Sequence, residues 1–504
     1  MLREEAEAIY ESGREAVVEA LLELSAGFEG LSGKIAEQTT AVAEQTTQVE
    51  ELARQIDELE RQAGRDSRNS SMPPSSDPPK SRAERRRLAR EAYKRSMRRT
   101  GAQPGHEGKS REMVAPERVD RRFEHLPERC GCGHVFDGGE EPVGDPVCHQ
   151  QYELPPVRPL VFEHARVRLA CPGCGRAMLA ELPGPALSGY GPRLEAHIAM
   201  LAGVFRLSRD QVRHVVVEVF GIPASKGCID NAIMRVNAIL ADPWTELRDA
   251  IRKAEAVHMD ETTWRLRGAQ QWLWVAASAL LACYRIDPSR SQQAAKELIG
   301  EEFGGFAVTD RYAGYHFLDV LQQQLCWCHC IRQLVEVSQR DGVTGRRGHK
   351  LVGLAREVIA SHRAYLQDDH DPEWLSAQLT PLREQIRTLL EQCAAGHHER
   401  TANFAAGLLD EYEALWTFCD VPDLHIDPTN NAAERAMRHP VLMRRLQGGT
   451  QSDRGNRWIE RIQSIRETCR LQDRPTLDWL THVTTAAHRG QPIPSLLPAA
   501  AQGP

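Results

Sequence analysis

The sequence contains no long apolar segment. No run of apolar residues approaches the roughly 18 residues of a candidate transmembrane helix, so we expect no membrane span. The first ten residues, MLREEAEAIY, carry acids where a signal peptide has basic residues followed by an apolar stretch. We therefore expect a cytoplasmic protein, in which the 13 cysteines are reduced thiols or metal ligands rather than disulfides.

Neither hydrophobic nor charged residues are scarce. They make up 41% and 26% of the 504 residues, which is ordinary for a soluble protein. At roughly 150 residues per domain, this length corresponds to about three folded units. A chain of this size can bury a core without disulfides to stabilise it.

The net charge of −7 conceals a basic segment. Residues 64–122 contain 17 Lys and Arg against 8 Asp and Glu, a local charge of +9, so the remainder of the chain carries −16. The part of this segment from residue 65 to 90 is dominated by Ser, Pro and Arg and has no apolar period, so it is not expected to fold alone. A basic segment on an acidic protein indicates a polyanionic partner, and a solvated disordered linker is the alternative.

A heptad repeat extends over residues 17–59. Eleven of its thirteen core positions are apolar, and the exceptions are Gln38 and Gln45. β-Branched residues at the first core position and Leu at the second favour a parallel two-stranded coiled coil. We therefore expect residues 1–63 to pair two copies of the chain. A long amphipathic helix folded back on its own domain is the alternative.

Four paired cysteines predict a structural zinc site within residues 123–185. A C-x-C pair precedes the strand-like segment VFEHARVRLA, and a C-x₂-C pair follows it. Two such pairs at the ends of a short β segment can offer four thiolates to tetrahedral Zn²⁺. His134 or Cys148 can replace one ligand of the shortened pair, and simple free thiols are the alternative. The paired residues are Cys130, Cys132, Cys171 and Cys174.

Residues 186–255 are expected to be helical. The segment RDQVRHVVVEVF has apolar residues at helical spacing, Gly221 ends it, and Ser225 can cap a second helix, KGCIDNAIMRVNAIL. Helix, short turn and helix is the arrangement of the helix-turn-helix motif. The second helix then reads DNA, or the pair is a plain helical hairpin.

From residue 256 the pattern changes to strands. AVHMDETTW, QQWLWVAASA and LLACYRI are expected to be three successive strands, followed by a helix near 291–299 and a buried strand, FAVTD. This order predicts a sheet of mixed direction. Asp260 is expected at the end of the first strand and Asp310 at the end of the fourth, where loops open outward and an acid is placed to act. Turn or cap roles are the alternative.

A third acid, Glu434, follows a helix-start signal formed by Pro428 and two asparagines. Asn431 and Glu434 have the spacing of a capping box, in which the glutamate only completes the first turn of the helix. Spacing alone therefore leaves both a structural and a catalytic interpretation of Glu434 open.

These motifs, in this order, resemble the transposases of the insertion sequence 66 family over nearly the whole chain. The zipper-like start and the cysteine pairs belong to the resemblance. The remaining strings are RNSS and PPSSD within 68–77, QPGH at 103–106, DET at 260–262, TDRYAGY at 309–315, NNAAER at 430–435 and GGTQSDRG at 448–455.

The resemblance implies an RNase H-like core whose acidic triad is Asp260, Asp310 and Glu434. A helical insertion separates the second and third acids. Such a triad would hold two Mg²⁺ ions, for which Mn²⁺ can substitute, with Asp260 bridging the pair. The implied activity is that of a DDE-type DNA transposase, which cleaves DNA to free a 3′-OH and then transfers that strand to target DNA.

The resemblance also implies neighbours of the site and partners. Arg435 and Arg438 would contact phosphate, unless they are only a helix-surface pair. Cys326 and His329 match a Cys-x₂-His pair that often follows the second aspartate. Cys328 and Cys330 stand where the family more often has small residues; we expect them to be buried thiols, and a second metal site is the alternative. Arg85, Arg86 and Arg87 would contact DNA. The expected partners are transposon-end and target DNA, a second copy of the chain, and companion proteins of the same element.

Together these expectations describe a multidomain α+β protein with a coiled coil, a zinc-ribbon-like unit, a helix-turn-helix-like region and an RNase H-like α/β core with a helical insertion. An inactive or domesticated DNA-binding protein of the same architecture, or a plain metal-dependent nuclease, is the alternative function. The expected parts are the coil 1–63, basic linker 64–122, zinc unit 123–185, helical DNA-binding region 186–255, first core part 256–315, insertion 316–426, second core part 427–490 and flexible tail 491–504.

Overall fold

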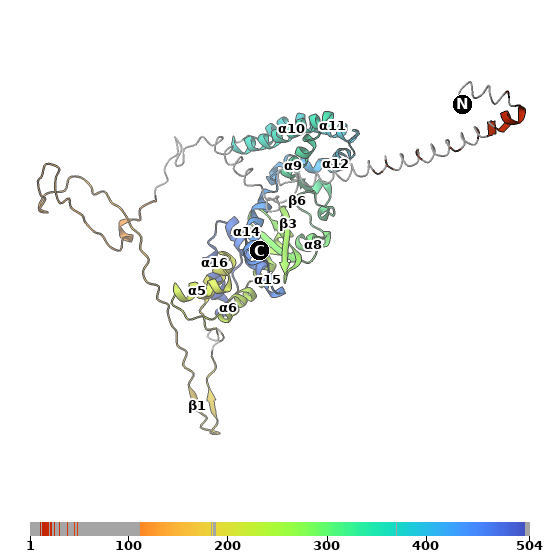
Figure 1. Ribbon diagram of the computed structural model, residues 1–504. Coiled ribbons are helices and arrows are strands. Elements are labelled where there is room, and N and C mark those ends of the chain that lie inside the picture. Colours follow the sequence, from red (N-terminus) through yellow and green to blue (C-terminus); the bar gives the residue numbers. More distant parts are fainter. Residues whose placement is uncertain are drawn as a thin grey trace. The chain divides into compact units, whose positions relative to one another are not determined.

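A computed structural model describes residues 111–498, except 183, 185–187 and 369, together with scattered residues between 11 and 48 (Figure 1). Most of the heptad segment therefore lies outside the described residues, as do Arg85, Arg86 and Arg87. By its internal contacts the chain divides into two units. One unit is Met1–Pro78 with Trp327–Tyr412, and the other is Pro79–Cys326 with Glu413–Pro504.

The second unit is built on a five-stranded mixed sheet. Its strand order is β5-β4-β3-β6-β7, in which β3, β4 and β5 are antiparallel neighbours and β6 and β7 run parallel to β3. The strands are β3 (Ala256–Leu266), β4 (Ala269–Ala277), β5 (Ala282–Asp287), β6 (Phe306–Thr309) and β7 (Gln323–Leu325). The predicted order of three strands, a helix and a fourth strand is confirmed, with α8 (Gln292–Ile299) between β5 and β6.

The prediction that Asp260 ends its strand is wrong, because β3 continues for six more residues to Leu266. The β-branched and aromatic residues after Asp260 suit a strand, and all of them pair with β4. The hairpin turns at Arg267 and Gly268, whose φ angles of 51° and 83° are those of a tight turn that favours glycine. The three-residue strand β7 is an element that the sequence pattern did not reveal.

Helix α15 (Asp453–Leu471) covers the outer edge of the sheet. The backbone N–H groups of Ala282, Tyr284 and Ile286 on β5 donate to side-chain oxygens of the helix at 3.0, 2.9 and 2.7 Å. These acceptors recur every fourth residue, one per helical turn, at Thr468, Ser464 and Glu460. The edge N–H groups, which would otherwise invite pairing with another strand, are thereby satisfied.

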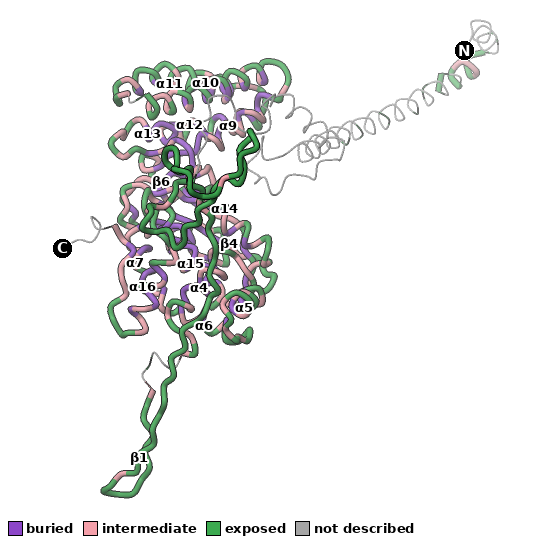
Figure 2. Tube along the Cα trace, turned by 90° about the vertical axis from the view of Figure 1, so that its left-hand side faces the viewer, coloured by how far each residue is buried: buried purple, intermediate pink, exposed green. Residues whose placement is uncertain are grey.

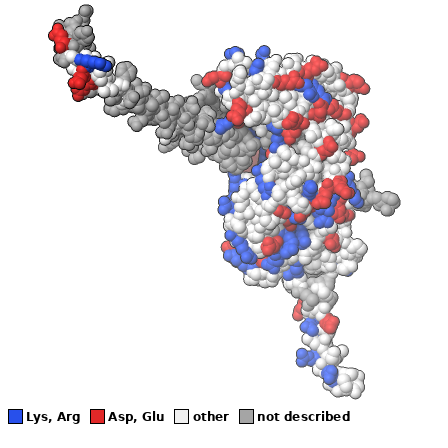
Figure 3. Space-filling view, turned by 90° about the vertical axis from the view of Figure 1, so that its right-hand side faces the viewer, with Lys and Arg blue, Asp and Glu red and all other residues white. Residues whose placement is uncertain are grey.

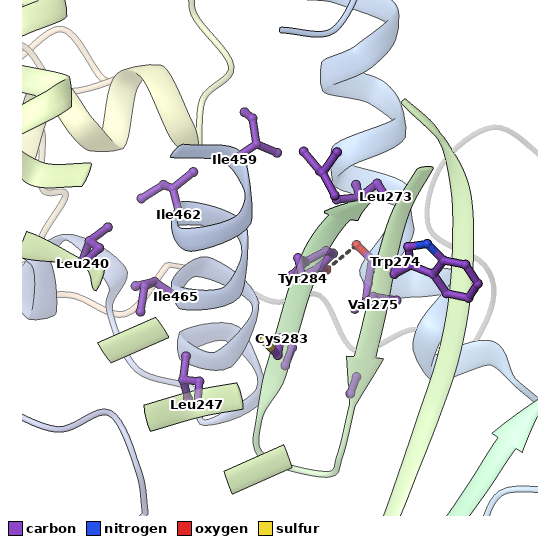
Figure 4. Packing of buried hydrophobic residues seen from close by; sticks show 14 of the residues in the cluster. Leu240, Leu247, Leu273, Trp274, Val275, Cys283, Tyr284, Ile459, Ile462 and Ile465 are labelled. Atoms are coloured by element: carbon purple, nitrogen blue, oxygen red, sulfur yellow. Dashed lines mark hydrogen bonds between the residues drawn. The ribbon is translucent and has the colours of Figure 1, made fainter. Parts of the chain in front are cut away.

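A single apolar core joins this sheet to the helices before and after it in sequence. Figure 4 shows Ile459, Ile462 and Ile465 of α15 between strand residues on one side and Leu240 and Leu247 on the other. Besides α15 and α8, the helices that contribute are α4 (Pro192–Gly203), α5 (Arg209–Glu218), α6 (Lys226–Ile239), α7 (Ala241–Ile251), α14 (Asn431–Gln447) and α16 (Thr476–His488).

The chain end also joins this core. Leu496 is fully buried, and its carbonyl oxygen accepts a hydrogen bond from Gln472 at 2.9 Å. The expectation of a flexible tail from residue 491 therefore does not hold for 491–498, because an apolar side chain fixes that segment. Residues 499–504 lie outside the described part.

The two segments predicted to be helical on either side of Gly221 are the helices α5 and α6. Ser208 and Gln211 form a capping box at the start of α5, and Ser225 accepts from the Cys228 amide at the start of α6. Gly221 between them has φ 65°, a left-handed conformation that suits glycine at the end of a helix. The sequence thus placed both helices, while DNA reading by α6 stays a prediction.

Residues 111–182 form a segment that is exposed along nearly its whole length (Figure 2). Its regular elements are η2 (Pro116–Arg118), β1 (Arg168–Ala170) and β2 (Ala177–Leu179), and the two strands form an antiparallel hairpin. The strand expected over VFEHARVRLA is therefore limited to its last three residues, because only these have a partner strand.

The first unit is helical where it is described after residue 326. Its helices are α9 (Trp327–Ser338), α10 (Gly342–Gln367), α11 (Pro372–Ala394) and α12 (Glu399–Asp410). The helical character predicted for the insertion is confirmed for these residues. Within the predicted insertion 316–426, β7 and α13 (Thr417–Asp420) belong to the sheet unit. Within the described part of the chain, no helix is both long enough and apolar enough to cross a lipid bilayer.

Candidate active site

Two of the three predicted acids lie side by side on neighbouring strands. In the parallel pair of β3 and β6, His258 is beside Val308. Continuing this register by two residues brings Asp260 beside Asp310, which directly follows the end of β6 as predicted. Adjacent strands are about 4.8 Å apart, and residues in register point to the same face. The two carboxyl groups therefore share one face of the sheet.

The third acid comes from the helix that covers this face. Tyr284 lies in register with Val275, and Val275 with Asp260, so all three side chains are on one side. The Tyr284 hydroxyl donates to the carbonyl oxygen of Ala436 in α14 at 2.8 Å. Glu434 lies in the first turn of the same helix and is half-buried. The fold thus brings Glu434 to the face that carries Asp260 and Asp310.

Electrostatics show that the acids interact. Burial raises the pKa of Asp260 well above its usual value, and the charges of Glu261, Asp310 and Glu434 raise it further. Burial also raises the pKa of Asp310, against the opposing effects of the Tyr312 amide and the Arg290 guanidinium. Burial is the main cause of both raised pKa values, and for Asp260 the neighbouring carboxylates add to its effect.

Such a set suits a hard divalent cation, because Mg²⁺ prefers carboxylate oxygens and would relieve their repulsion. Among the described residues, no three His, Cys, Asp or Glu side chains are already gathered around one point that could hold a metal ion.

The capping-box interpretation of Glu434 is not supported. Helix α14 begins at Asn431, so its N-cap is Asn430, and this residue makes no side-chain capping hydrogen bond. The Asn430 side chain instead donates to the carbonyl oxygen of Met259 at 2.6 Å. Structural capping therefore does not account for an acid at position 434.

A buried ion pair beside the acids was not foreseen. The side chain of Glu261 is only 2% exposed, and its Oε1 accepts from Arg290 Nη2 at 2.6 Å and Nε at 2.9 Å. The Tyr315 hydroxyl donates to the other carboxylate oxygen. Tyr315 lies within the motif quoted for the family resemblance, whereas no sequence signal connects Arg290, 29 residues away, to Glu261.

Aromatic rings hold the arginine of this pair in place. The Arg290 guanidinium carbon is 3.7 Å from the ring centroid of Tyr312 and 4.9 Å from that of Trp272. The Tyr312 backbone N–H donates to Asp310 at 3.0 Å, so the same tyrosine contacts both the arginine and the second acid. Arg290 is therefore a fixed guanidinium near Asp310, and the Glu261 carboxylate balances its charge.

The arginines predicted to contact phosphate lie on the surface of α14. Arg435 and Arg438 are both exposed, and Arg445 continues their helical spacing on the exposed face. Between Arg438 and the end of the helix, Arg444 bonds to the Thr262 hydroxyl at 3.1 Å and the Thr263 hydroxyl at 2.5 Å, which fixes the helix to β3. Sequence reasoning missed Arg445, although its spacing from Arg438 was available.

The other predicted site residues near the second acid are Cys326 and His329. Cys326 is buried directly after β7, whereas His329 lies on α9, which belongs to the other unit. Cys330 is buried as expected, but Cys328 is only half-buried because it faces away from the buried stripe of α9.

The cysteine pairs occupy two different turns. Hydrogen bonds from the His134 amide and the Cys130 thiol hold the pKa of the Cys132 thiol below its usual value. The amides of Gly173 and Cys174 do the same for Cys171. Thiolates favoured in this way suit zinc binding. The described residues contain no site that unites the pairs, so the four-thiolate zinc site stays a prediction.

Comparison with known proteins identifies two matching families. Residues 188–457, which include all three acids, match the family described as "Transposase IS66 family". Residues 14–112 match a family of unknown function, DUF6444. The cysteine pairs fall between the two matched regions.

Two curated relatives come from Sinorhizobium fredii strain NGR234. "Uncharacterized protein y4qI" is 24% identical over 288 residues, which cover 50% of this chain and 51% of the relative. "Uncharacterized protein y4hP" is 25% identical over 382 residues, which cover 68% of this chain and 67% of the relative. The chain thus spans about half the length of the first relative.

Proposed function

Because the chain belongs to the IS66 transposase family, we propose that it is a DDE-type DNA transposase that cleaves transposon ends and transfers them to target DNA. The observation that supports the proposal is that strand register puts Asp260 beside Asp310, while α14, which carries Glu434, packs on the same face of the sheet. The strand order, with three antiparallel strands followed by two parallel ones, supports an RNase H-like core.

The three acids would hold Mg²⁺, or Mn²⁺ in its place. When bound, two such ions supply an activated oxygen nucleophile and neutralise charge on the leaving oxygen of a phosphodiester. The acids themselves contribute hard oxygen ligands and no proton transfer. Hydrolysis at a transposon end leaves a 3′-OH. Attack of that 3′-OH on a target phosphodiester then joins the strands and releases a 3′-OH of the target.

The exposed arginines of α14 would place the DNA backbone. Arg435, Arg438 and Arg445 begin one residue after Glu434 and continue along the helix away from it. Figure 3 shows acidic and basic side chains interspersed on the face in view, so overall charge does not mark a DNA surface. The row of Arg435, Arg438 and Arg445, which starts next to Glu434, is a better indication of where DNA binds, because phosphate contacts set the position of DNA on a protein.

The remaining parts would hold the ends during the reaction. The heptad segment would pair two copies of the chain, and a dimer suits a reaction that must hold two DNA ends. The cysteine pairs would hold a structural Zn²⁺, and α6 would contact DNA. Metal analysis of the purified chain tests the zinc part, and sedimentation of residues 1–64 tests the coil. Protein without zinc, or a monomeric fragment, would refute the respective part.

The catalytic part is tested by Glu434→Gln. The substrate is a duplex that contains the inverted repeats bracketing the reading frame. The variant should fold and bind this duplex as the unmodified chain does, yet lose Mg²⁺-dependent cleavage, because an amide is a poor Mg²⁺ ligand. Glu301→Gln, at an exposed acid of the same unit, is the matched control and should cleave normally.

The outcomes separate the alternative functions. Wild-type cleavage by Glu434→Gln would refute the assigned role. A chain that binds the duplex but never cleaves it would indicate a DNA-binding protein without activity. Cleavage without joining to a target duplex would indicate a plain nuclease.

A further inference from the structure

Strands β6 and β7 end beside the acids, next to the middle of β3. Register places Thr309 beside Leu325, so the next residues, Asp310 and Cys326, are also neighbours. The Cys326 backbone N–H donates to the Thr309 carbonyl oxygen at 2.8 Å and so continues the strand pairing. Cys326, directly after β7, and Met259 on β3 therefore lie on opposite sides of the end of β6, which leads into the second acid.

Asn430 connects these two flanking strands. Its backbone N–H donates to Cys326 Sγ at 3.1 Å, and its side-chain Nδ2 donates to the Met259 carbonyl oxygen at 2.6 Å. Asn430 is 1% exposed, and both of its partners are equally buried. One residue thus contacts the strand that carries Asp260 and the strand next to Asp310.

The same residue begins the helix that carries the third acid. The Glu434 backbone N–H donates to the Asn430 carbonyl oxygen at 3.1 Å, which is the first hydrogen bond of α14. Before it, Asp427 accepts from both the amide and the hydroxyl of Thr429 at 2.7 Å, which shapes the incoming turn. The position of Glu434 relative to the two aspartates therefore depends on where Asn430 is fixed.

The strand that provides the sulfur acceptor is itself fixed. Gln324 is fully buried in β7, and its Oε1 accepts from the Phe418 amide at 2.8 Å, while its Nε2 donates to the Leu415 carbonyl oxygen at 3.2 Å. A three-residue strand would be weak alone, but these side-chain bonds tie it to the segment that contains Leu415 and Phe418. Cys326 is consequently an acceptor at a defined place.

We propose that Asn430 and Cys326 are positioning residues that set the distance of Glu434 from Asp260 and Asp310. This inference rests on the proposed function, because it assigns the bonds a role in forming the metal-binding acid site. A single asparagine makes a bond to each flanking strand and starts the helix, so losing either bond lets the start of α14 move without unfolding it. Groups that orient metal ligands in this way typically affect metal affinity and rate about 10- to 100-fold.

The test uses the full chain and Mn²⁺ as the probe. Cys326→Ala removes the sulfur acceptor, Cys326→Ser keeps an acceptor at nearly the same place, and Asn430→Ala removes the bond to Met259. Cys469→Ala is the matched control, since it removes another fully buried thiol, on α15. Calorimetry measures Mn²⁺ affinity, cleavage assays separate kcat from the KM for DNA, and thermal unfolding reports stability.

Cys326→Ala and Asn430→Ala should each weaken Mn²⁺ binding and lower kcat by about 10- to 100-fold, with little change in the KM for DNA. Cys326→Ser should remain close to the unmodified chain. Cys469→Ala should lower only the Tm. The inference is overturned if Cys326→Ala and Asn430→Ala keep normal Mn²⁺ affinity and kcat. It is also overturned if Cys469→Ala loses as much Mn²⁺ affinity and kcat as these two variants do.

The readouts distinguish this inference from the proposed function. If the unmodified chain binds Mn²⁺ but does not cleave DNA, the proposed function fails while the affinity series still decides the positioning role. If the unmodified chain binds no Mn²⁺, both are refuted, because there is then no ligand site to position.

Discussion

Removing Arg290 leaves a buried carboxylate without its counter-charge. In Arg290→Met the Glu261 side chain, 2% exposed, keeps the hydrogen bond from the Tyr315 hydroxyl and loses both bonds to the guanidinium. The methionine side chain can still fill part of the space between Tyr312 and Trp272. The variant therefore tests mainly the loss of the charge.

The expected cost follows from the burial of each partner. Breaking a fully buried pair costs about 3–5 kcal/mol, because the remaining charge is unpaired. The Arg290 side chain is 37% exposed, so water reaches one end of this pair and screens it. With Tyr315 still bound to Glu261, we expect about 1–3 kcal/mol for Arg290→Met. Glu261→Gln should cost about 1 kcal/mol, because the amide oxygen still accepts hydrogen bonds.

The decisive quantity is the coupling in the double-mutant cycle. Adding Glu261→Gln to Arg290→Met removes the unpaired charge. The loss of unfolding free energy in the double variant should therefore be about 1–2 kcal/mol smaller than the sum of the two single losses. Urea unfolding without divalent ions, followed by hydrogen exchange of peptides from β3 and β4, assigns the free energy to the sheet unit rather than the helical unit.

Arg248→Met is the matched control. Arg248 also pairs with an aspartate, Asp249, and lies over the ring of Trp244, but the Asp249 side chain is 50% exposed. This control should lose no more than about 1 kcal/mol. Two results would refute the view that Glu261 depends on this arginine. One is an Arg290→Met variant that loses no more unfolding free energy than the control. The other is a double variant whose loss equals the sum of the two single losses.

Three further predictions follow from particular contacts. Ser464→Ala removes the acceptor of the Tyr284 amide at the edge of the sheet and should cost about 1–3 kcal/mol in urea unfolding; an unchanged midpoint would contradict it. Burial lowers the pKa of His439 to about 4, so the unfolded state binds this proton first. Stability should therefore fall by about 1.4 kcal/mol per unit as the pH drops from 6.5 towards 4. His439→Gln should lack this part of the pH dependence, and an unchanged slope would count against it. Replacing Arg435 and Arg438 by Gln should reduce the salt dependence of DNA binding by about two phosphate contacts, whereas an equal slope would place the DNA elsewhere.

Local patterns in the sequence were sufficient to predict most helices and strands and some of the candidate site residues. Periodicity and caps predicted the strands β3 to β6, the helices α5, α6 and α8, and the helical insertion, because each signal lies within a few consecutive residues. The end of β6 at Thr309 likewise followed from its apolar run, and with it the place of Asp310. The three acids could be named in advance, although the family resemblance, more than spacing, selected them.

Only the tertiary structure determined the contacts between residues far apart in the sequence, because these contacts depend on how the strands align. Asp260 is inside β3, and it is the parallel pairing with β6 that brings it beside Asp310. The bond between Arg290 and Glu261 and the bridge from Asn430 to β3 and β7 join residues 29 to 171 positions apart. No periodicity encodes such contacts, because they arise only when strands align and a helix covers their common face.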